Sequence, residues 1–442
     1  MTPSMTQGIA GIALQDTPLL DIDPLLDDPG TRIIVCCGAG GVGKTTTAAA
    51  LGVRAAERGR KAVVLTIDPA RRLAQSMGID LLDNTPRRVD GIKGDGELHA
   101  MMLDMKRTFD EIVETHADPA RARAILENPF YQSLSAGFAG TQEYMAMEKL
   151  GQLRARDEWD LIVVDTPPSR SALDFLDAPK RLGSFLDGKF IRLLMAPAKM
   201  GGRAGMKFLN VGMSMMTGTL GKLLGGQLLR DVQTFVAAMD TMFGGFRTRA
   251  DATYRLLQAP GTAFLVVAAP ERDALREAAY FVERLAAEEM PLAGLVLNRV
   301  HGSGAARLSA ERALAAAENL EEDRIVDQEA GKAGPRDSTG SSPDSPAVES
   351  APDVADTPDA LDASDASLAH TTPQLTAGLL RLHAERMQVL AREQRTRDRF
   401  TALHPEVAVA EVAALPGDVH DLAGLRAIGD RLATGGSPVG AA

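Results

Sequence analysis

A strand, a glycine-rich loop and a helix follow one another within Arg32–Thr47, and this stretch constrains the fold more than any other. Its apolar run Ile33–Cys37 has the composition of a strand buried on both faces. Gly38–Thr45 then fits the pattern G-x-x-x-x-G-K-[ST], and an Ala-rich helical stretch follows from Thr46. A phosphate-binding loop needs this order, because its glycines let backbone N–H groups turn inward at a helix N-terminus. The alternative is a plain glycine turn that matches the pattern by chance.

The loop predicts a binding site for ATP and Mg²⁺. In such a site Lys44 reaches the β- and γ-phosphates during catalysis, and the Thr45 hydroxyl binds the metal. Asp165 closes the apolar strand Trp159–Asp165 and is the expected second metal residue, usually acting through water. A buried strand can also end in an aspartate by chance. The predicted nucleotide-binding residues of the loop are Gly38, Gly40, Gly41, Val42, Gly43, Lys44, Thr45 and Thr46.

Buried strands alternate with helical stretches along the chain, which predicts an α/β fold with a doubly wound, mostly parallel sheet. The expected strands are 33–37, 61–68, 98–104, 159–165, 262–268, 292–298 and 407–412. Besides the helix after the loop, the expected helices are 71–77, 106–115, 141–156, 273–288, 375–400 and 422–432.

Two interruptions divide this pattern. Residues 185–245 lose the strand pattern and hold eight of the 18 methionines, which predicts a helical, Met-rich insertion. Residues 327–372 form an Ala/Asp/Ser/Pro/Thr tract almost without large apolar side chains, which predicts a disordered acidic loop. We therefore expect one α/β domain over 31–326 and 373–435, a loose N-terminal arm over 1–30 and a flexible tail over 436–442.

Charge and cysteine content narrow the class of partner and the compartment. The net charge of −11 is concentrated, because ten acidic residues face two basic ones between Asp327 and Asp365, a net of −8. The rest of the chain is only mildly acidic, so bulk charge argues against a nucleic-acid partner and does not suggest a membrane surface. Cys36 and Cys37 are adjacent in one strand, which suits neither a disulfide nor a metal pair and fits a reducing cytosol.

Targeting and metal patterns are not found in the sequence. The first ten residues do not read as a signal peptide, and no apolar run approaches the roughly 20 residues of a membrane span. The seven histidines are scattered and do not predict a zinc site.

The glycine spacing of the loop resembles that of one family. Gly38–Thr45 reads G-A-G-G-V-G-K-T and is similar to the deviant loop G-K-G-G-x-G-K-[ST] of the ArsA-type arsenical-pump ATPases and of the targeting ATPases for tail-anchored membrane proteins. MinD, ParA and the nitrogenase iron protein are more distant members. In this family the first lysine reaches across a dimer interface to the partner's nucleotide. Ala39 stands at that position here, so the resemblance implies a dimer in which this contact is missing.

Two further stretches resemble the switch segments of the family. Asp68-Pro69-Ala70 is similar to switch I, whose aspartate orients the water that attacks the γ-phosphate, and Asp68 is therefore the candidate catalytic residue. Its alternative role is a helix N-cap before Arg71. The stretch from Asp165 to Ser171 is similar to switch II, which relays the nucleotide state to the partner-binding region in this family. Arg170 and Ser171 replace a glycine and a histidine, so this relay is in question here.

The resemblance also assigns residues around the base and the phosphates. Asn298 matches an asparagine that reads the adenine edge, and Leu415–Asp418 matches, more weakly, a loop that packs on adenine. Arg71 and Arg72 stand where the family has His-Asn or His-Ser. These guanidinium groups either compensate for the missing lysine or are solvated helix charges.

The resemblance implies a cytosolic, Mg²⁺-dependent, dimeric ATPase whose nucleotide state gates binding of a protein or hydrophobic client. The Met-rich stretch aligns with the client groove of the targeting ATPases, although the same methionines can equally fill an ordinary helical core. The partner is a second copy or a paralogous ATPase that keeps the lysine, which leaves this chain as a weakly hydrolysing subunit. A MinD/ParA-like positioning ATPase is the rival; it predicts a basic amphipathic helix or a DNA-binding patch at the C-terminus, where Gly429–Ala442 is rich in Gly, Ala and Pro.

Overall fold

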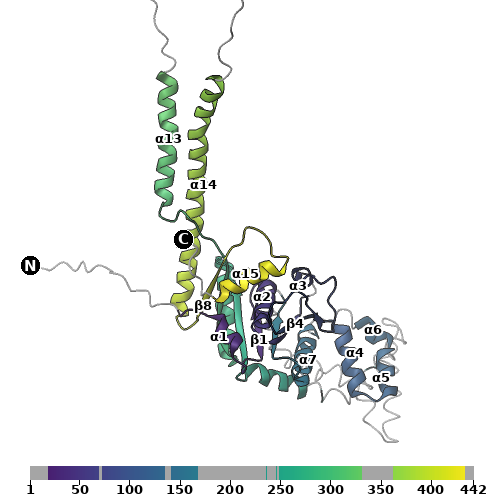
Figure 1. Cartoon of the computed structure of the whole chain (residues 1–442). Helices are drawn as coiled ribbons and strands as arrows, with labels where there is room; N and C mark the ends of the chain where they lie inside the picture. The colour runs from purple at the N-terminus through teal and green to yellow at the C-terminus, as the bar shows by residue number, and fades with distance from the viewer. Residues whose placement is uncertain are drawn as a thin grey trace, which may run out of the picture. The chain divides into compact units, whose positions relative to one another are not determined.

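Eight strands form one sheet in the order β3-β4-β2-β5-β1-β6-β7-β8, and helices cover both of its faces (Figure 1). The structure is a computed structural model that describes residues 18–68, 72–134, 141–167, 235, 245, 248–330 and 362–433. The chain divides into two compact units. The sheet unit takes up residues to Val300 and from Thr396, and the second unit covers His301–Arg395.

Neighbouring strands of the sheet run parallel, except that β3 pairs antiparallel with β4 at one edge. The predicted doubly wound, mostly parallel α/β sheet is thereby confirmed. The strand order reverses at β1, which lies between β5 and β6. The strands are β1 (Ile33–Cys37), β2 (Lys61–Thr66), β3 (Arg87–Arg88), β4 (Glu97–Met102), β5 (Leu161–Asp165), β6 (Thr262–Ala268), β7 (Leu292–Val300) and β8 (Val409–Ala413).

The helices of the described chain include several that the sequence did not predict, among them α1, α5, α6 and α13. By contrast, α7 begins and ends at the predicted residues. The helices are α1 (Ile22–Asp27), α2 (Lys44–Glu57), α3 (Arg72–Ser76), α4 (Met105–His116), α5 (Pro119–Leu126), α6 (Pro129–Leu134), α7 (Thr141–Arg156), α12 (Arg272–Ala287), α13 (Ala310–Ala330), α14 (Asp362–Leu403) and α15 (Leu422–Ala433).

Alternate residues of β1 face two separate hydrophobic cores. Ile33, Val35 and Cys37 belong to the core beneath α4, α7 and α12, whereas Ile34 and Cys36 belong to the core beneath α1, α2, α3 and α15. Because helices cover both faces, the strand must be apolar at every position, and all five of its residues are buried. The two cysteines are free thiols, and they belong to the cores on opposite faces of the sheet.

A short helix lies within residues 1–30, which the sequence predicted to be a loose arm. Helix α1 occupies residues 22–27, and its Ile22 and Leu26 are fully buried. The buried guanidinium of Arg60 donates to the carbonyl oxygens of Leu26 and Thr31 at 3.0 and 2.6 Å. An arginine paired only with backbone carbonyls gives no signal in the sequence, and this contact fastens α1 to the sheet unit. Residues 1–17 lie outside the described chain.

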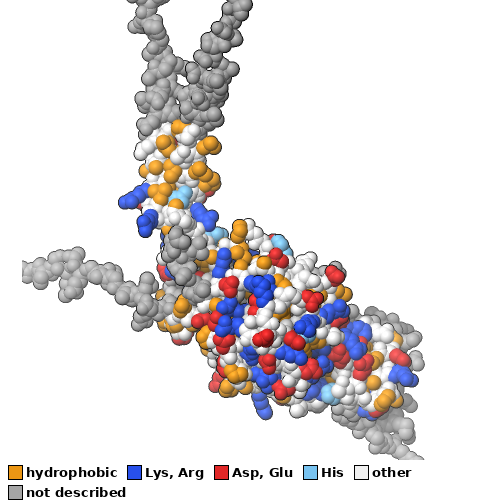
Figure 2. All heavy atoms as spheres, in the orientation of Figure 1, with side chains coloured by type: hydrophobic (Ala, Val, Ile, Leu, Met, Phe, Trp, Pro, Cys, Tyr) orange, Lys and Arg blue, Asp and Glu red, His pale blue; other side chains and the backbone are white. Residues whose placement is uncertain are grey.

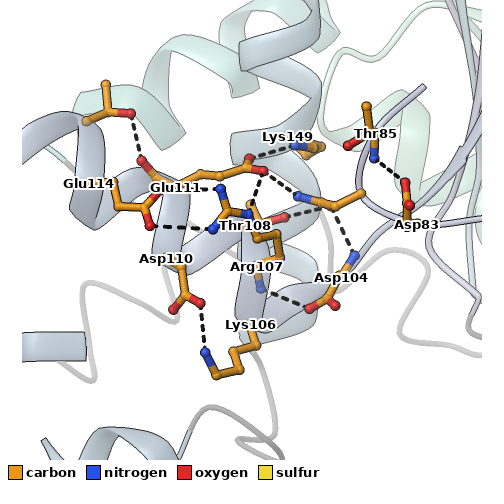
Figure 3. A network of polar contacts seen from close by, with 12 residues as sticks. Asp83, Thr85, Asp104, Lys106, Arg107, Thr108, Asp110, Glu111, Glu114 and Lys149 are labelled. Atoms are coloured by element: carbon orange, nitrogen blue, oxygen red, sulfur yellow. Dashed lines mark hydrogen bonds and ion pairs between the residues drawn. The ribbon is translucent and has the colours of Figure 1, made fainter. Parts of the chain in front are cut away.

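A buried polar network joins α4 to α7 and to the loop before β3 (Figure 3). Glu111 of α4 accepts from Lys149 of α7 at 2.8 Å and from Asn84 Nδ2 at 3.2 Å. Asn84 Oδ1 in turn accepts from the Thr108 hydroxyl at 3.1 Å. Each buried polar group named here has a partner, so the network is a structural tie. Its Lys149 and Asn84 are as buried as Lys44 and Asn298 and lie outside the predicted nucleotide site, so they are matched controls for substitutions of those two residues.

The second unit pairs α13 with the first part of α14. Small residues from both helices are fully buried: Ala313, Ala317, Ala377 and Ala384. Helix α13 extends to Ala330 and α14 begins at Asp362, so both helices reach into the stretch 327–372, whose disorder stays a prediction. Alanine supports a helix without large apolar side chains. Residues 331–361 lie outside the described chain.

Two other predicted segments lie outside the residues that the structure describes. They are the Met-rich insertion, 185–245, of which only residues 235 and 245 are described, and the tail from 434 onward. On the face that Figure 2 shows, basic and acidic side chains are interspersed over the sheet unit. Within the residues that the structure covers, no helix is long and apolar enough to cross a membrane.

Candidate nucleotide-binding site

Three neighbouring strands of the sheet end beside the glycine-rich loop. The parallel register places Asp165 of β5 opposite Cys36 of β1 and opposite Thr66 of β2. The carboxyl ends of β1, β2 and β5 therefore meet at one edge, where β1 runs directly into Gly38. This edge lies at the reversal of strand order, which is where ligands bind in open α/β sheets.

The loop needs glycine at two positions for steric reasons. Gly38 has φ of +144°, and a Cβ there would lie 2.1 Å from the Val267 carbonyl oxygen. Gly43, the residue before α2, has φ of +97°, and a Cβ there would lie 2.2 Å from Asn298 Nδ2. Gly41 has φ of +76° with nothing within 4 Å, so its constraint is the backbone conformation alone. Close contacts and positive φ therefore require glycine at Gly38 and Gly43, whereas positive φ alone favours it at Gly41.

Lys44 begins α2, and its side chain lies folded into the loop. The residue is 5% exposed, and Nζ donates to the Ala39 carbonyl oxygen at 2.8 Å. Burial lowers the pKa of this ammonium group, and the nearby Asp165 carboxylate opposes that shift. A phosphate in the loop would supply the counter-charge that a buried ammonium needs. Thr46 follows in the first turn of α2 and is half-buried.

Asp165 is fully buried and holds two hydroxyl groups. Its Oδ2 accepts from Thr45 at 2.7 Å and from Thr66 at 2.9 Å. Its Oδ1 has no hydrogen-bond partner among the described residues. Burial raises the pKa of this carboxyl to about 6, against the lowering effect of the two hydroxyl groups and of Lys44.

This arrangement fits Mg²⁺. The described residues contain no group of three or more His, Cys, Asp or Glu side chains that could hold a metal by themselves. Mg²⁺ is often held by one or two protein oxygens together with substrate phosphates and water. Thr45 and Asp165 present such oxygens side by side, and the unpartnered Oδ1 is a buried acceptor that a cation would satisfy.

The unusual pKa of Asp165 leads to a prediction about stability. The folded pKa of about 6 lies above the ordinary 3.8, so ionising Asp165 costs the folded chain about 3 kcal/mol at neutral pH. Asp165→Asn keeps an oxygen for Thr45 and Thr66 but carries no charge. We expect the nucleotide-free variant to be more stable than wild type by about 2–3 kcal/mol at pH 7.

The pH dependence gives the control for this prediction. Because the folded pKa is raised, wild type loses stability relative to Asp165→Asn as the pH rises from about 4 to about 6, and the difference stays constant above. Urea unfolding of both proteins at pH 4, 5, 6 and 7 measures this difference. A variant that is less stable than wild type at pH 7 would contradict the assignment of a buried, unbalanced charge.

Asp68 follows β2 by two residues and lies near the loop. It is half-buried, and its backbone N–H donates to the Thr66 hydroxyl at 3.2 Å. Burial lowers the pKa of Lys44 and the charge of Asp68 opposes that lowering; burial raises the pKa of Asp165 and the charge of Asp68 adds to that rise. Helix α3 begins at Arg72, and residues 69–71 between them lie outside the described chain, as does the switch II stretch from residue 168 onward. The catalytic and capping roles of Asp68 both stay predictions.

Asn298 of β7 contacts the loop directly. The residue is 7% exposed, and Nδ2 donates to the Val42 carbonyl oxygen at 2.9 Å. The predicted contact of this side chain with adenine stays a prediction. Leu415–Asp418 follows β8, the neighbour of β7 in the sheet.

Sequence reasoning missed two residues at this edge. The Thr66 hydroxyl binds Asp165, and Gln142 Nε2 of α7 donates to the Ile67 carbonyl oxygen at 2.8 Å. Thr66 lies within the predicted strand 61–68, two residues before Asp68, which is a weak signal. Its pairing with Asp165 depends on β2 and β5 being neighbours, which the sequence does not specify.

Comparison with known proteins places the chain among ATPases. Residues 31–321 match the family model described as anion-transporting ATPase. ATPase GET3 of Malassezia globosa is 30% identical over 158 residues, which are 36% of this chain and 45% of that protein. ATPase GET3 of Podospora anserina is 25% identical over 281 residues, 63% of this chain and 76% of that protein. ATPase ARSA2 of Chlamydomonas reinhardtii is 27% identical over 297 residues, 64% of this chain and 72% of that protein.

Proposed function

The chain belongs to the anion-transporting ATPase family, and from this membership we propose that it binds ATP with Mg²⁺ in the loop Gly38–Thr45 and hydrolyses it. The observation that carries the proposal is the 2.7 Å hydrogen bond from Thr45 to the fully buried Asp165. It brings the two predicted metal residues together beside a loop in which Gly38 and Gly43 leave no room for a side chain. In this function Lys44 binds the phosphates, Thr45 and Asp165 hold the metal, and Asp68 orients the attacking water.

Metal dependence tests this assignment directly. When bound, Mg²⁺ neutralises charge on the β- and γ-phosphates. Calorimetric titration of ATP into the full chain should give clearly tighter binding with Mg²⁺ than with EDTA. Equal affinity in the two conditions would contradict the metal roles of Thr45 and Asp165.

The assembly that we propose is a nucleotide-gated dimer, and Ala39 bears on its composition. Ala39 is 8% exposed and packs in the core beneath α2. A homodimer of this chain would have two sites that both miss a lysine from the opposite subunit. A heterodimer with a paralogous ATPase that carries the lysine would give this chain a complete site, and we propose it as the second candidate assembly. In that case the chain alone hydrolyses ATP weakly.

Ala39→Lys separates these assemblies. One charge-assisted contact to a developing phosphoryl charge is worth about 2–4 kcal/mol, or roughly two to three decades in rate. If a missing cross-subunit contact limits the homodimer, Ala39→Lys should raise steady-state turnover substantially, with the lysine stem lying along apolar surface. Ala39→Met has a similar length without the charge and should not raise it. Brisk wild-type turnover that Ala39→Lys leaves unchanged would contradict the heterodimer.

The client is the least constrained part of the proposed function. We propose a protein or hydrophobic client bound through the Met-rich stretch 185–245, because flexible thioether side chains suit varied apolar ligands. The names of the relatives, including a putative arsenical pump-driving ATPase of Halobacterium salinarum, describe those proteins. We further propose that the chain works in a reducing cytosol, which its two free thiols suit.

A further inference from the structure

Strand β7 contains an irregularity immediately after Asn298. Asn298 pairs with Val412 and Val300 with Ala413, so Arg299 is an extra residue relative to β8. Arg299 also has φ of +62°, a left-handed conformation that is uncommon for a residue with a side chain. Such bulges turn the side chains beside them out of the regular alternation, and they are frequent next to active sites. Here the bulge lies one residue from a side chain that contacts the phosphate-binding loop.

The amide of Asn298 meets the loop at two neighbouring residues. Nδ2 donates to the Val42 carbonyl oxygen at 2.9 Å in a buried contact. The same nitrogen occupies the space that a Cβ on Gly43 would need, at 2.2 Å. The hydrogen bond and the steric contact fix the same peptide group, which joins Val42 to Gly43.

Peptide geometry gives this contact a consequence for phosphate binding. The peptide unit is planar and trans, so its C=O and N–H point in opposite directions. When the Val42 carbonyl is held toward Asn298, the Gly43 N–H must point away from Asn298. Backbone N–H groups are what a phosphate-binding loop offers its ligand. A peptide that turned over would present an oxygen instead, which repels phosphate.

We propose that Asn298 is a positioning residue of the phosphate loop, whose side-chain amide holds the Val42–Gly43 peptide in the orientation that binds the triphosphate. This role differs from contact with adenine, because it makes Asn298 matter for ligands that have no base. It rests on the proposed function, since it presumes that the loop binds ATP.

Ligands with and without a base separate the two roles. We expect Asn298→Ala to weaken MgATP and Mg²⁺-tripolyphosphate by the same factor, about tenfold for one hydrogen bond, and to leave the preference for ATP over GTP unchanged. Unchanged tripolyphosphate affinity, with weaker ATP binding and a lost preference for ATP, would overturn the positioning role. The matched control is Asn84→Ala, which removes another buried, hydrogen-bonded asparagine from the network in Figure 3. It should leave both affinities unchanged.

A double-mutant cycle tests the contact itself. Gly43→Ala should weaken tripolyphosphate binding through collision with the Asn298 amide and through backbone strain. Once Asn298→Ala has removed the amide, only the strain remains, so the double variant should bind no more weakly than Gly43→Ala alone. If the double variant instead loses tripolyphosphate affinity by the product of the two single-variant losses, the two residues are not coupled. That result would overturn the inference.

Hydrogen exchange makes the test independent of any ligand. In the nucleotide-free chain, the Thr47 amide, which donates to the Gly43 carbonyl oxygen at 2.9 Å, should exchange at least about tenfold faster in Asn298→Ala than in wild type. Equal exchange rates would overturn the positioning role even if wild type binds no nucleotide. Failure of wild type to bind MgATP would contradict the proposed function, whereas wild-type binding with equal Thr47 exchange in both proteins would contradict this inference alone.

Discussion

Lys44→Ala should bind MgATP at least about a hundredfold more weakly than wild type, which amounts to about 3 kcal/mol. The ammonium group is buried at 5% exposure and held by a single described contact to the Ala39 carbonyl, so it is directed into the loop. Burial lowers its pKa, and a phosphate would provide a stronger counter-charge than a neutral carbonyl does. Alanine removes this charge but preserves the glycine frame and the helix that follows.

Isothermal calorimetry with MgATP measures this loss, and a second buried lysine gives the control. Lys149 is also almost fully buried, and it pairs with Glu111 at 2.8 Å in the network of Figure 3, outside the predicted site. Lys149→Ala should therefore keep wild-type affinity for MgATP, at some expense in stability. Wild-type affinity in Lys44→Ala would contradict the assignment of the loop Gly38–Thr45 as the MgATP-binding site.

Asp68→Asn should bind MgATP with nearly wild-type affinity but hydrolyse it at least about a hundredfold more slowly, because the carboxylate that orients the attacking water is lost. Asp68 is half-buried and acts on the loop electrostatically, because its charge opposes the lowering of the Lys44 pKa by burial. The loop glycines, Thr45 and Asp165 all remain in the variant, so the phosphates and the metal keep their ligands. The amide cannot orient the attacking water as the carboxylate does.

Single-turnover hydrolysis, measured beside the binding titration, separates the two possible roles of Asp68. If Asp68 only caps the helix that follows, Asp68→Asn should leave turnover at the wild-type value, because asparagine is an equally good N-cap. Equal turnover would therefore return Asp68 to a structural role. Reduced turnover together with equally reduced affinity would point to damage of the loop and would also contradict the catalytic assignment.

The local parts of the site could be predicted from the sequence, because each depends on neighbours in the chain. The loop follows its strand directly, so Gly38, Lys44 and Thr45 needed only the spacing of glycines between β1 and α2. Strand β5 was recognisable because its apolar run ends in Asp165. Buried parallel strands are apolar throughout, which makes them distinct from the surrounding helices.

The contacts between strands could not be predicted in the same way. That Thr66 and Asp165 share a hydrogen bond depends on the order of β2, β5 and β1 in the sheet, which no local pattern encodes. The hydrogen bond from Asn298 to Val42 spans 256 positions of sequence and depends on the bulge at Arg299. A left-handed arginine gives no sequence signal, unlike a glycine in the same conformation.

Elements with unusual composition were also missed. Strand β3 consists of two arginines, and as an edge strand of the sheet it pairs only with β4. Helix α1 has just two buried residues, Ile22 and Leu26, and depends on charged contacts such as the one from Arg54 to Asp23 at 2.5 Å. Such short elements gain their stability from tertiary contacts, so local propensity does not reveal them.

Steady-state phosphate release by the purified full-length chain, with ATP and Mg²⁺, is the most direct test of the claim that it is an ATPase. Wild type and Lys44→Ala are measured together, each alone and after co-purification with its native partners. We expect ATP-dependent phosphate release from wild type that disappears with EDTA and in Lys44→Ala, and that rises with the partners if a paralogous subunit supplies the missing lysine. Release that is the same in wild type and Lys44→Ala, or absent from wild type in both settings, would contradict the account.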